Sequence, residues 1–286
     1  MSAQLAQYLL SGVTIGAIYA LVALGFSIIF NASHVINFAQ GEFVMIGGMT
    51  TVSLTGTGLP LPAAMVAALV GLALEKFAVE PARGAPVVTL IIITIGASIL
   101  LRGLATLVWD KKLHTIAPFS GSTPIEIAGA ALLPQSLWVL GVTLAIVLAL
   151  SWFFGHTLLG KAMVATSNQR VAAQLVGINV RRVLLISFGL SGALGAVAGI
   201  LITPITLTAW DVGIMLGLKG FAAAVLGGLG SGPGAVLGGL VLGIAETLSA
   251  GYLSSAYKDV IAFVLMLAVL FFKPTGILGS RAAERV

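Results

Sequence analysis

The chain has 286 residues, of which 59% are hydrophobic and 8% are charged, and its net charge is +5. Soluble domains carry about 25% charged residues, so this composition excludes a soluble globular protein and indicates a polytopic membrane protein. The apolar runs are long enough to span a bilayer as helices and do not alternate, which excludes a transmembrane β-barrel. The small net charge and the lack of any nucleic-acid-binding pattern mean that no nucleic acid is expected as a partner.

The apolar runs predict an all-α bundle with about eight or nine membrane spans, forming a single transmembrane domain over residues 1–286. In chain order, the predicted spans are 9–30, 35–55, 60–79, 87–109, 135–155, 183–203, 214–230, 233–250 and 259–273. A glycine-rich stretch at 227–234 interrupts the run from 214 to 250. That run is therefore either two spans or a pair of half-helices with one span.

Lysine and arginine residues predict the orientation of the bundle. Cytoplasmic loops of membrane proteins are enriched in these residues. The basic residues that fall on one side are Lys76, Arg83, Lys161, Arg170, Arg181, Arg182, Lys273, Arg281 and Arg285, and those on the other are Lys111, Lys112 and Lys258. The uneven distribution predicts that the N-terminus is outside and the C-terminus is in the cytoplasm.

The segment joining the first two spans is rich in polar side chains close to the membrane, among them Asn37, Gln40 and Glu42. Polar groups at that depth need protein partners or a water-filled cavity. These three residues are therefore candidates for a substrate path or gate. The alternative is that they only tie neighbouring helices together.

Three further ionisable residues fall inside predicted spans: Arg102, Lys219 and Glu246. Buried charges in a membrane are costly unless they are paired. Lys219 and Glu246 lie in adjacent segments, and we expect them to pair with each other. Arg102 lies near the end of its span, and we expect its side chain to extend outward to the membrane surface.

The loop at 160–182 carries a concentration of basic residues between two spans, which places it in the cytoplasm. Its pattern predicts a short helix over 169–176, with Ser167 and Asn168 as N-terminal caps and Gly177 as the stop. A short helix held at the membrane surface is suited to docking a soluble partner.

No catalytic or metal-binding pattern is present, and the chain has no cysteine. The glycine-rich stretch at 227–234 lacks the Lys-Ser/Thr pair of a nucleotide-binding loop. We therefore expect a transport subunit, not an enzyme, with no cofactor of its own. Any use of chemical energy would need another chain.

Four motifs in order along the chain resemble the LivH-type permease of branched-chain amino acid ABC transporters. They are VINFAQGE at 35–42, the loop at 160–182 ending in GIN, KGFAAAVLGGLGSGPG at 219–234 and KPTGILG at 273–279. The resemblance covers nearly the whole chain. It implies a multi-pass permease of the bacterial inner membrane, in contact with membrane lipid, that forms half of a translocation path.

The resemblance also implies partners: a second related permease, two ATP-binding cassette subunits that bind ATP and Mg, and a periplasmic substrate-binding protein. It assigns coupling to the ATPase to eight residues of the basic loop, namely Lys161, Ser167, Asn168, Arg170, Ala172, Ala173, Leu175 and Gly177. Ser167 and Asn168 stand where the family commonly has acidic residues, and Val164 stands where it has a basic one.

Two alternatives remain open at this point. Related permeases with the same motifs carry urea, short amides or aromatic acids, and the sequence does not separate these cargoes. A protein of a different class, an ion-coupled secondary transporter or channel, would use Glu42, Lys219 and Glu246 as an ion relay. The basic loop argues against that class, because such a transporter needs no docking helix there.

Overall fold

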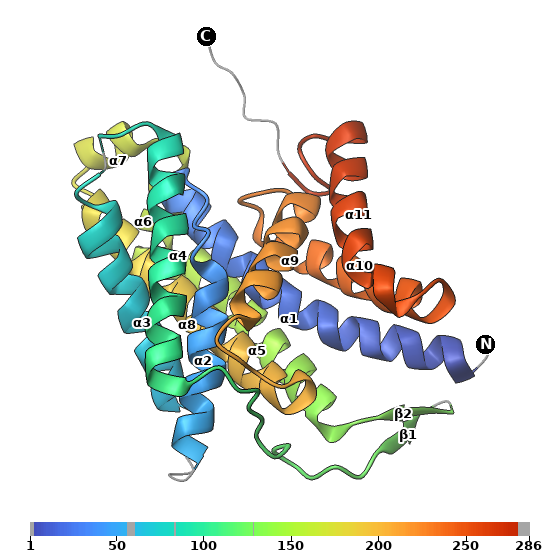
Figure 1. Ribbon diagram of the computed structural model, residues 1–286. Coiled ribbons are helices and arrows are strands. Elements are labelled where there is room, and N and C mark those ends of the chain that lie inside the picture. Colours follow the sequence, from blue (N-terminus) through green and yellow to red (C-terminus); the bar gives the residue numbers. More distant parts are fainter. Residues whose placement is uncertain (1–2, 56–60, 83, 128, 280–286) are drawn as a thin grey trace.

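The computed structural model describes residues 3–55, 61–82, 84–127 and 129–279, which form a helical bundle (Figure 1). The elements are α1 (Ala3–Ser33), α2 (Gln40–Leu54), α3 (Leu61–Leu74), a π-helical turn (Glu75–Val79), α4 (Val87–Trp109), β1 (Ile125–Ile127), β2 (Ala130–Leu132), α5 (Pro134–His156), α6 (Leu158–Asn168), α7 (Arg170–Leu175), α8 (Val180–Thr206), α9 (Val212–Gly227), α10 (Gly232–Tyr252), a 3₁₀ turn (Ser255–Tyr257) and α11 (Lys258–Phe272). Three basic residues used in the orientation count, Arg83, Arg281 and Arg285, lie outside the described residues.

The helical fold class is confirmed, and each predicted span overlaps a helix, although the second helix begins at Gln40 and not at residue 35 as predicted. Within the described residues, 6 segments are long and apolar enough to cross a membrane by themselves: 3–33, 87–109, 134–156, 180–206, 232–252 and 255–272. The interrupted run is resolved into two helices, α9 and α10, with a break at 228–231. The antiparallel hairpin β1–β2, in which Glu126 faces Ala131, is an addition to the predicted all-α fold.

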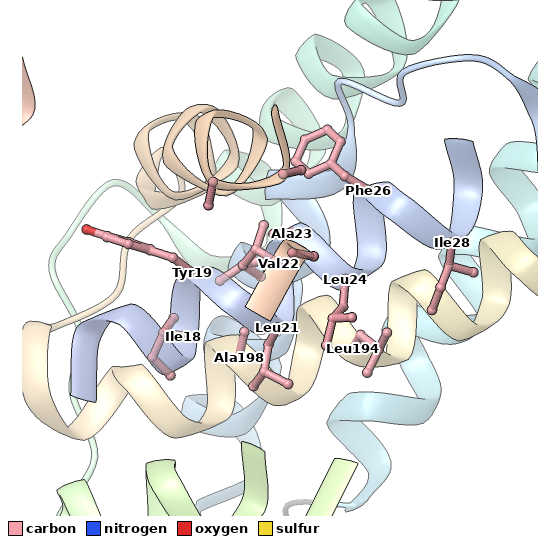
Figure 2. Close-up of a cluster of buried hydrophobic side chains, with 14 of the residues drawn as sticks. Ile18, Tyr19, Leu21, Val22, Ala23, Leu24, Phe26, Ile28, Leu194 and Ala198 are labelled. Atoms are coloured by element: carbon pink, nitrogen blue, oxygen red, sulfur yellow. The ribbon is translucent and has the colours of Figure 1, made fainter. Parts of the chain in front are cut away.

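Helix α1 lies at the centre of the bundle. Its middle part is apolar on every side, which is typical of a helix surrounded by protein, and Ile18, Leu21 and Val22 are fully buried. Figure 2 shows Leu21 beside Ala198 of α8 and Leu24 beside Leu194 of the same helix. Helices α8, α9 and α10 pack along α1, and α2 packs mainly on α8 and α9. Helices α4, α5 and α11 expose most of their apolar surface, although α5 also touches α1.

Small residues let α1 and α10 approach each other backbone to backbone, as the glycine content of the spans predicts. A methyl group added at Gly243 would overlap the backbone of Gly12 and Gly16, and one added at Gly239 would overlap Ala20. The contact therefore requires glycine on α10.

We expect Gly243→Val to prevent normal packing of α10 on α1, because the added side chain would meet backbone atoms that cannot move aside. The readout is the yield of monodisperse protein after detergent extraction. Gly141→Val is the matched control, since nothing lies within 4 Å of a methyl group added at Gly141. Equal yields for the two variants would contradict the close packing.

Connecting segments gather at two opposite ends of the bundle. At one end, here called the α7 end, Arg170 Nη2 donates to Ala32 O at 2.8 Å. At the same end, Asn31 Nδ2 donates to Gly230 O at 2.7 Å, and the backbone of 277–278 pairs with the last turn of α9. The basic loop at 160–182 is called the coupling segment below, after its expected role. The end of α1, the coupling segment, the α9–α10 turn and the C-terminal motif therefore lie together.

The opposite end, here called the hairpin end, holds the start of α1 and the long loop before α5. Gln7 exchanges hydrogen bonds with the backbone of Ala131, at 3.1 and 2.8 Å. His114 pairs with Thr208 through two backbone hydrogen bonds. Helices α1, α8, α9 and α10 therefore each run from one end of the bundle to the other, whereas α6 and α7 both lie at the α7 end.

Candidate functional site

The coupling segment consists of two helices, α6 and α7, instead of the single short helix predicted. Thr157 caps α6, because its hydroxyl accepts a hydrogen bond from Gly160 N at 3.0 Å. An extended residue, Gln169, then breaks the chain before α7 begins. The sequence does not predict the cap at Thr157, because the apolar run of α5 continues into α6 without a glycine or proline between them.

The prediction that Ser167 and Asn168 cap the short helix is wrong. Ser167 Oγ donates back to Val164 O within α6 at 2.8 Å, and Asn168 is the last residue of that helix. Residue Gln169 precedes α7 and makes no side-chain cap. The predicted stop is confirmed, since Gly177 has a φ of +85°, which favours glycine after a helix.

Helix α7 lies at the edge of the bundle (Figure 1) and exposes apolar side chains. Val171, Leu175 and Val176 are 64%, 84% and 76% exposed. Ala172 is also exposed, whereas Ala173 is 3% exposed and packs inward. The expectation that both alanines are available to a partner is therefore wrong for Ala173, because it lies on the inner face of the helix.

Two contacts fix the coupling segment to the bundle. Besides donating to Ala32, Arg170 lies near His34. Burial lowers the pKa of the His34 imidazole, and the positive charge of Arg170 lowers it further. Arg181, at the start of α8, forms an ion pair with Glu80 next to the π-helical turn. Arg170 therefore ties the start of α7 to the end of α1, and Arg181 ties the start of α8 to the residue after the π-helical turn.

The remaining residues assigned to coupling lie on the surface of α6. Lys161 and Asn168 are exposed, and Ser167 is partly buried. Ser167 also lines, with Met163 and Val164, a cavity of about 580 Å³ between α1, α5, α6 and α10. The sequence carried no signal for this cavity, which is formed by residues far apart in the chain.

Asn37 and Gln40 are both buried and hold the start of α2 in place. Asn37 Oδ1 accepts a hydrogen bond from Ala39 N at 3.1 Å. Gln40 Nε2 donates to Ser191 O at 3.2 Å, and the Ser191 hydroxyl donates to Gln40 Oε1 and to Gly25 O. Gln40 therefore connects α1, α2 and α8. This agrees with the alternative that these polar residues hold neighbouring helices together.

Glu42 meets Arg102, which corrects the expectation that Arg102 extends to the membrane surface. Arg102 Nε lies 3.3 Å from Glu42 Oε1, and Ser98 Oγ donates to the same oxygen at 2.7 Å. Glu42 is 1% exposed. The attraction of a buried carboxylate outweighs the gain from snorkelling, and the sequence did not reveal it because α2 and α4 are not neighbours in the chain.

The expected pair of Lys219 and Glu246 is confirmed, with Lys219 Nζ 2.7 Å from Glu246 Oε1. Two residues that the sequence did not single out complete the cluster. Tyr19 donates its hydroxyl proton to Glu246 Oε2 at 2.7 Å, and Asp259 Oδ1 lies 2.6 Å from Lys219 Nζ. The cluster joins α1, α9, α10 and α11.

Within the residues that the structure describes, no group of three or more His, Asp or Glu side chains could hold a metal ion. The polar sites of the bundle are hydrogen-bonded or ion-paired clusters.

Comparison with known proteins identifies the family. Residues 8–270 match the family described as "Branched-chain amino acid transport system / permease component". The chain is 36% identical to the high-affinity branched-chain amino acid transport system permease protein LivH of Escherichia coli (strain K12), over 98% of this chain and 97% of that protein. It is 35% identical to BraD of Pseudomonas aeruginosa, with the same coverage.

More distant similarity extends to other importers. The ribose import permease protein RbsC of Escherichia coli is 29% identical over 89% of each chain. Because the family match spans most of the sequence and the LivH and BraD proteins align over nearly their full length, this chain belongs to the family of branched-chain amino acid transport permeases.

Proposed function

We propose that the chain is the permease subunit of an ABC importer and forms half of the path by which branched-chain amino acids cross the bacterial inner membrane. The observation that carries the proposal is the exposed apolar surface of α7, fixed to α1 by the Arg170–Ala32 contact. The names of the relatives support the cargo class. The few ionisable side chains of the spans suit cargo with apolar side chains.

The energy would come from partners: two ATP-binding cassette subunits that hold ATP and Mg, a second related permease, and a periplasmic substrate-binding protein. In this arrangement, the ATPase subunit binds the surface formed by Val171, Ala172 and Leu175. Its closure moves α7 and, through Arg170, the end of α1. Asn37 and Gln40 would hold the start of α2, so that the candidate gate residues Asn37, Gln40 and Glu42 move with the end of α1.

Complementation of a strain that lacks its own branched-chain uptake systems tests the cargo. We expect expression of this chain with its partner subunits to restore uptake of leucine, isoleucine and valine. Restored uptake of urea, acetamide or phenylalanine, without uptake of leucine, would assign one of the alternative cargoes instead.

For topology, we propose nine membrane passes, with the N-terminus outside and the α7 end in the cytoplasm. The basic residues support this orientation, and so does the alternation of α1, α8, α9 and α10 between the α7 end and the hairpin end. Helix α9, with 16 residues, is shorter than a bilayer core of about 30 Å. It is shielded by protein, because most of its residues are buried.

Cysteine labelling tests this topology, since the chain has no cysteine of its own. We expect Ser122→Cys, in the loop at the hairpin end, to react with a membrane-impermeant maleimide in intact spheroplasts. Gln174→Cys, exposed on α7, should react only after the membrane is opened. The reverse pattern would show that the bundle is oriented the other way.

A further inference from the structure

The chain re-enters the bundle after α1, so that α2 begins near the middle of the membrane. Residues 34–39 are not helical, and Phe38 N donates to Thr94 Oγ1, well inside α4, at 3.2 Å. The helical rise from Glu42 to Ser53, near the hairpin end of α2, is about 16 Å, or about half of a bilayer core. Non-helical backbone at this depth is found where it is covered by protein or lines a polar path.

Glu42 places a buried carboxyl group at this depth. It lies in the first turn of α2, where a carboxylate is stabilised by the helix dipole. Its Oε1 atom contacts Ser98 and Arg102 as described above, whereas Oε2 is buried without a hydrogen-bond partner. A methyl group at Gly213 of α9 would lie 2.8 Å from Oε2, so the carboxylate also has little room to move.

Arg102 is paired only in part. Within the described part of the chain, its Nε atom lies 3.3 Å from Glu42 Oε1 without forming a hydrogen bond, and no hydrogen bond is made by its two Nη groups. The side chain is 24% exposed, on a helix whose neighbouring surface is otherwise apolar, with Ile99 and Leu100 exposed. Ionisable side chains are rare within membrane spans, and a substrate path is one of the places where they occur.

The free edge of a guanidinium matches the paired oxygens of a carboxylate or a phosphate. Its parallel N–H donors bind a carboxylate through two hydrogen bonds. Glu42 already offsets much of the positive charge, so a carboxylate bound at Arg102 would be held weakly. A permeating solute needs this, because a site on a path must release what it binds.

From this geometry, we infer that the Nη groups of Arg102 bind the carboxylate of the amino acid as it crosses the middle of the membrane, with Glu42 and Ser98 as positioning residues. The inference rests on the proposed function and adds to it a contact between the permease and the cargo. The cargo chemistry selected here is the α-carboxylate, which branched-chain amino acids share with other amino acids and which urea and amides lack.

The test uses the complete complex in proteoliposomes and measures uptake of radiolabelled leucine per ATP hydrolysed. We expect Arg102→Gln to lower this ratio more than tenfold, because the carboxylate loses its partner while the ATPase still docks. Arg102→Lys keeps the charge but loses the two-pronged geometry, and should lower the ratio by a smaller factor. Thr106→Val, one turn further along the exposed side of α4, is the matched control and should transport like the wild type.

The double variant Glu42→Gln/Arg102→Gln separates a cargo contact from a structural ion pair. A structural pair predicts that the double variant recovers wild-type uptake, since no charge is left unmatched; a cargo contact predicts that it stays as low as Arg102→Gln. Recovery in the double variant, or wild-type uptake by Arg102→Gln, would overturn the inference and assign Arg102 to a lipid or to the second permease.

If Arg102→Gln prevents assembly, Arg102→Lys decides alone, and wild-type uptake by it would overturn the inference. A wild-type complex that takes up no leucine would instead count against the proposed function.

Discussion

Replacing Ala172 with glutamate is expected to lower leucine uptake more than tenfold while the chain still folds and inserts. Ala172 is exposed on α7 among apolar side chains, so the new carboxylate would meet no other part of this chain. In a docked complex, it would be buried against the ATPase surface, and an unpaired buried charge strongly disfavours binding. The complex should then hydrolyse ATP without moving cargo, or lose its ATPase subunits.

The measurement is leucine uptake and ATP hydrolysis by the same preparation. Ala256→Glu places the same substitution at an exposed alanine of the hairpin end and should leave the ratio of uptake to hydrolysis unchanged. Ala173→Glu should behave differently from both, with loss of folded protein, because Ala173 is buried. Wild-type uptake by Ala172→Glu would remove α7 from the coupling mechanism.

Lys219→Met is expected to destabilise the folded chain strongly. The substitution leaves Glu246 buried without its cation and removes the partner of Asp259. Breaking a buried ion pair from one side typically costs about 3–5 kcal/mol. Glu246→Gln should cost much less, because Lys219 keeps its contact with Asp259 and the amide still accepts the hydrogen bond of Tyr19.

Combining the two substitutions tests whether the cluster acts as a unit. The double variant Lys219→Met/Glu246→Gln should be more stable than Lys219→Met alone, since the buried carboxylate is gone. The readouts are the thermal midpoint and the yield of extracted complex for both single variants and the double. Strictly additive effects would mean that Lys219 and Glu246 do not interact in the folded protein. If Lys219→Met assembles normally but does not transport leucine, Lys219 belongs to the substrate path and not to a structural ion pair.

The helices of this fold could be predicted from the sequence because apolar length and glycine breaks are local signals. The split between α9 and α10 at the glycine-rich turn is an example. The hairpin β1–β2 was missed because strands of three residues carry no periodic pattern. The break at Gln169 was missed because it depends on one extended residue between two helices, and not on composition.

The candidate sites divide in the same way. The pair of Lys219 and Glu246 could be predicted because α9 and α10 are consecutive and two unlike charges within them need each other. The contact between Glu42 and Arg102 could not, because it joins helices separated by α3 and depends on how far residues 34–39 reach into the bundle. Tyr19 and Asp259 likewise come from elements that meet only in the folded chain.

The energy source of uptake distinguishes an ABC importer from an ion-coupled transporter. The complete complex is reconstituted in proteoliposomes with binding protein on the outside, and ATP is either enclosed or left out. We predict leucine uptake that requires enclosed ATP and is unchanged when a protonophore collapses the proton gradient. Uptake without ATP that disappears with the protonophore would show that the chain is not an ABC importer subunit and would identify an ion-coupled transporter.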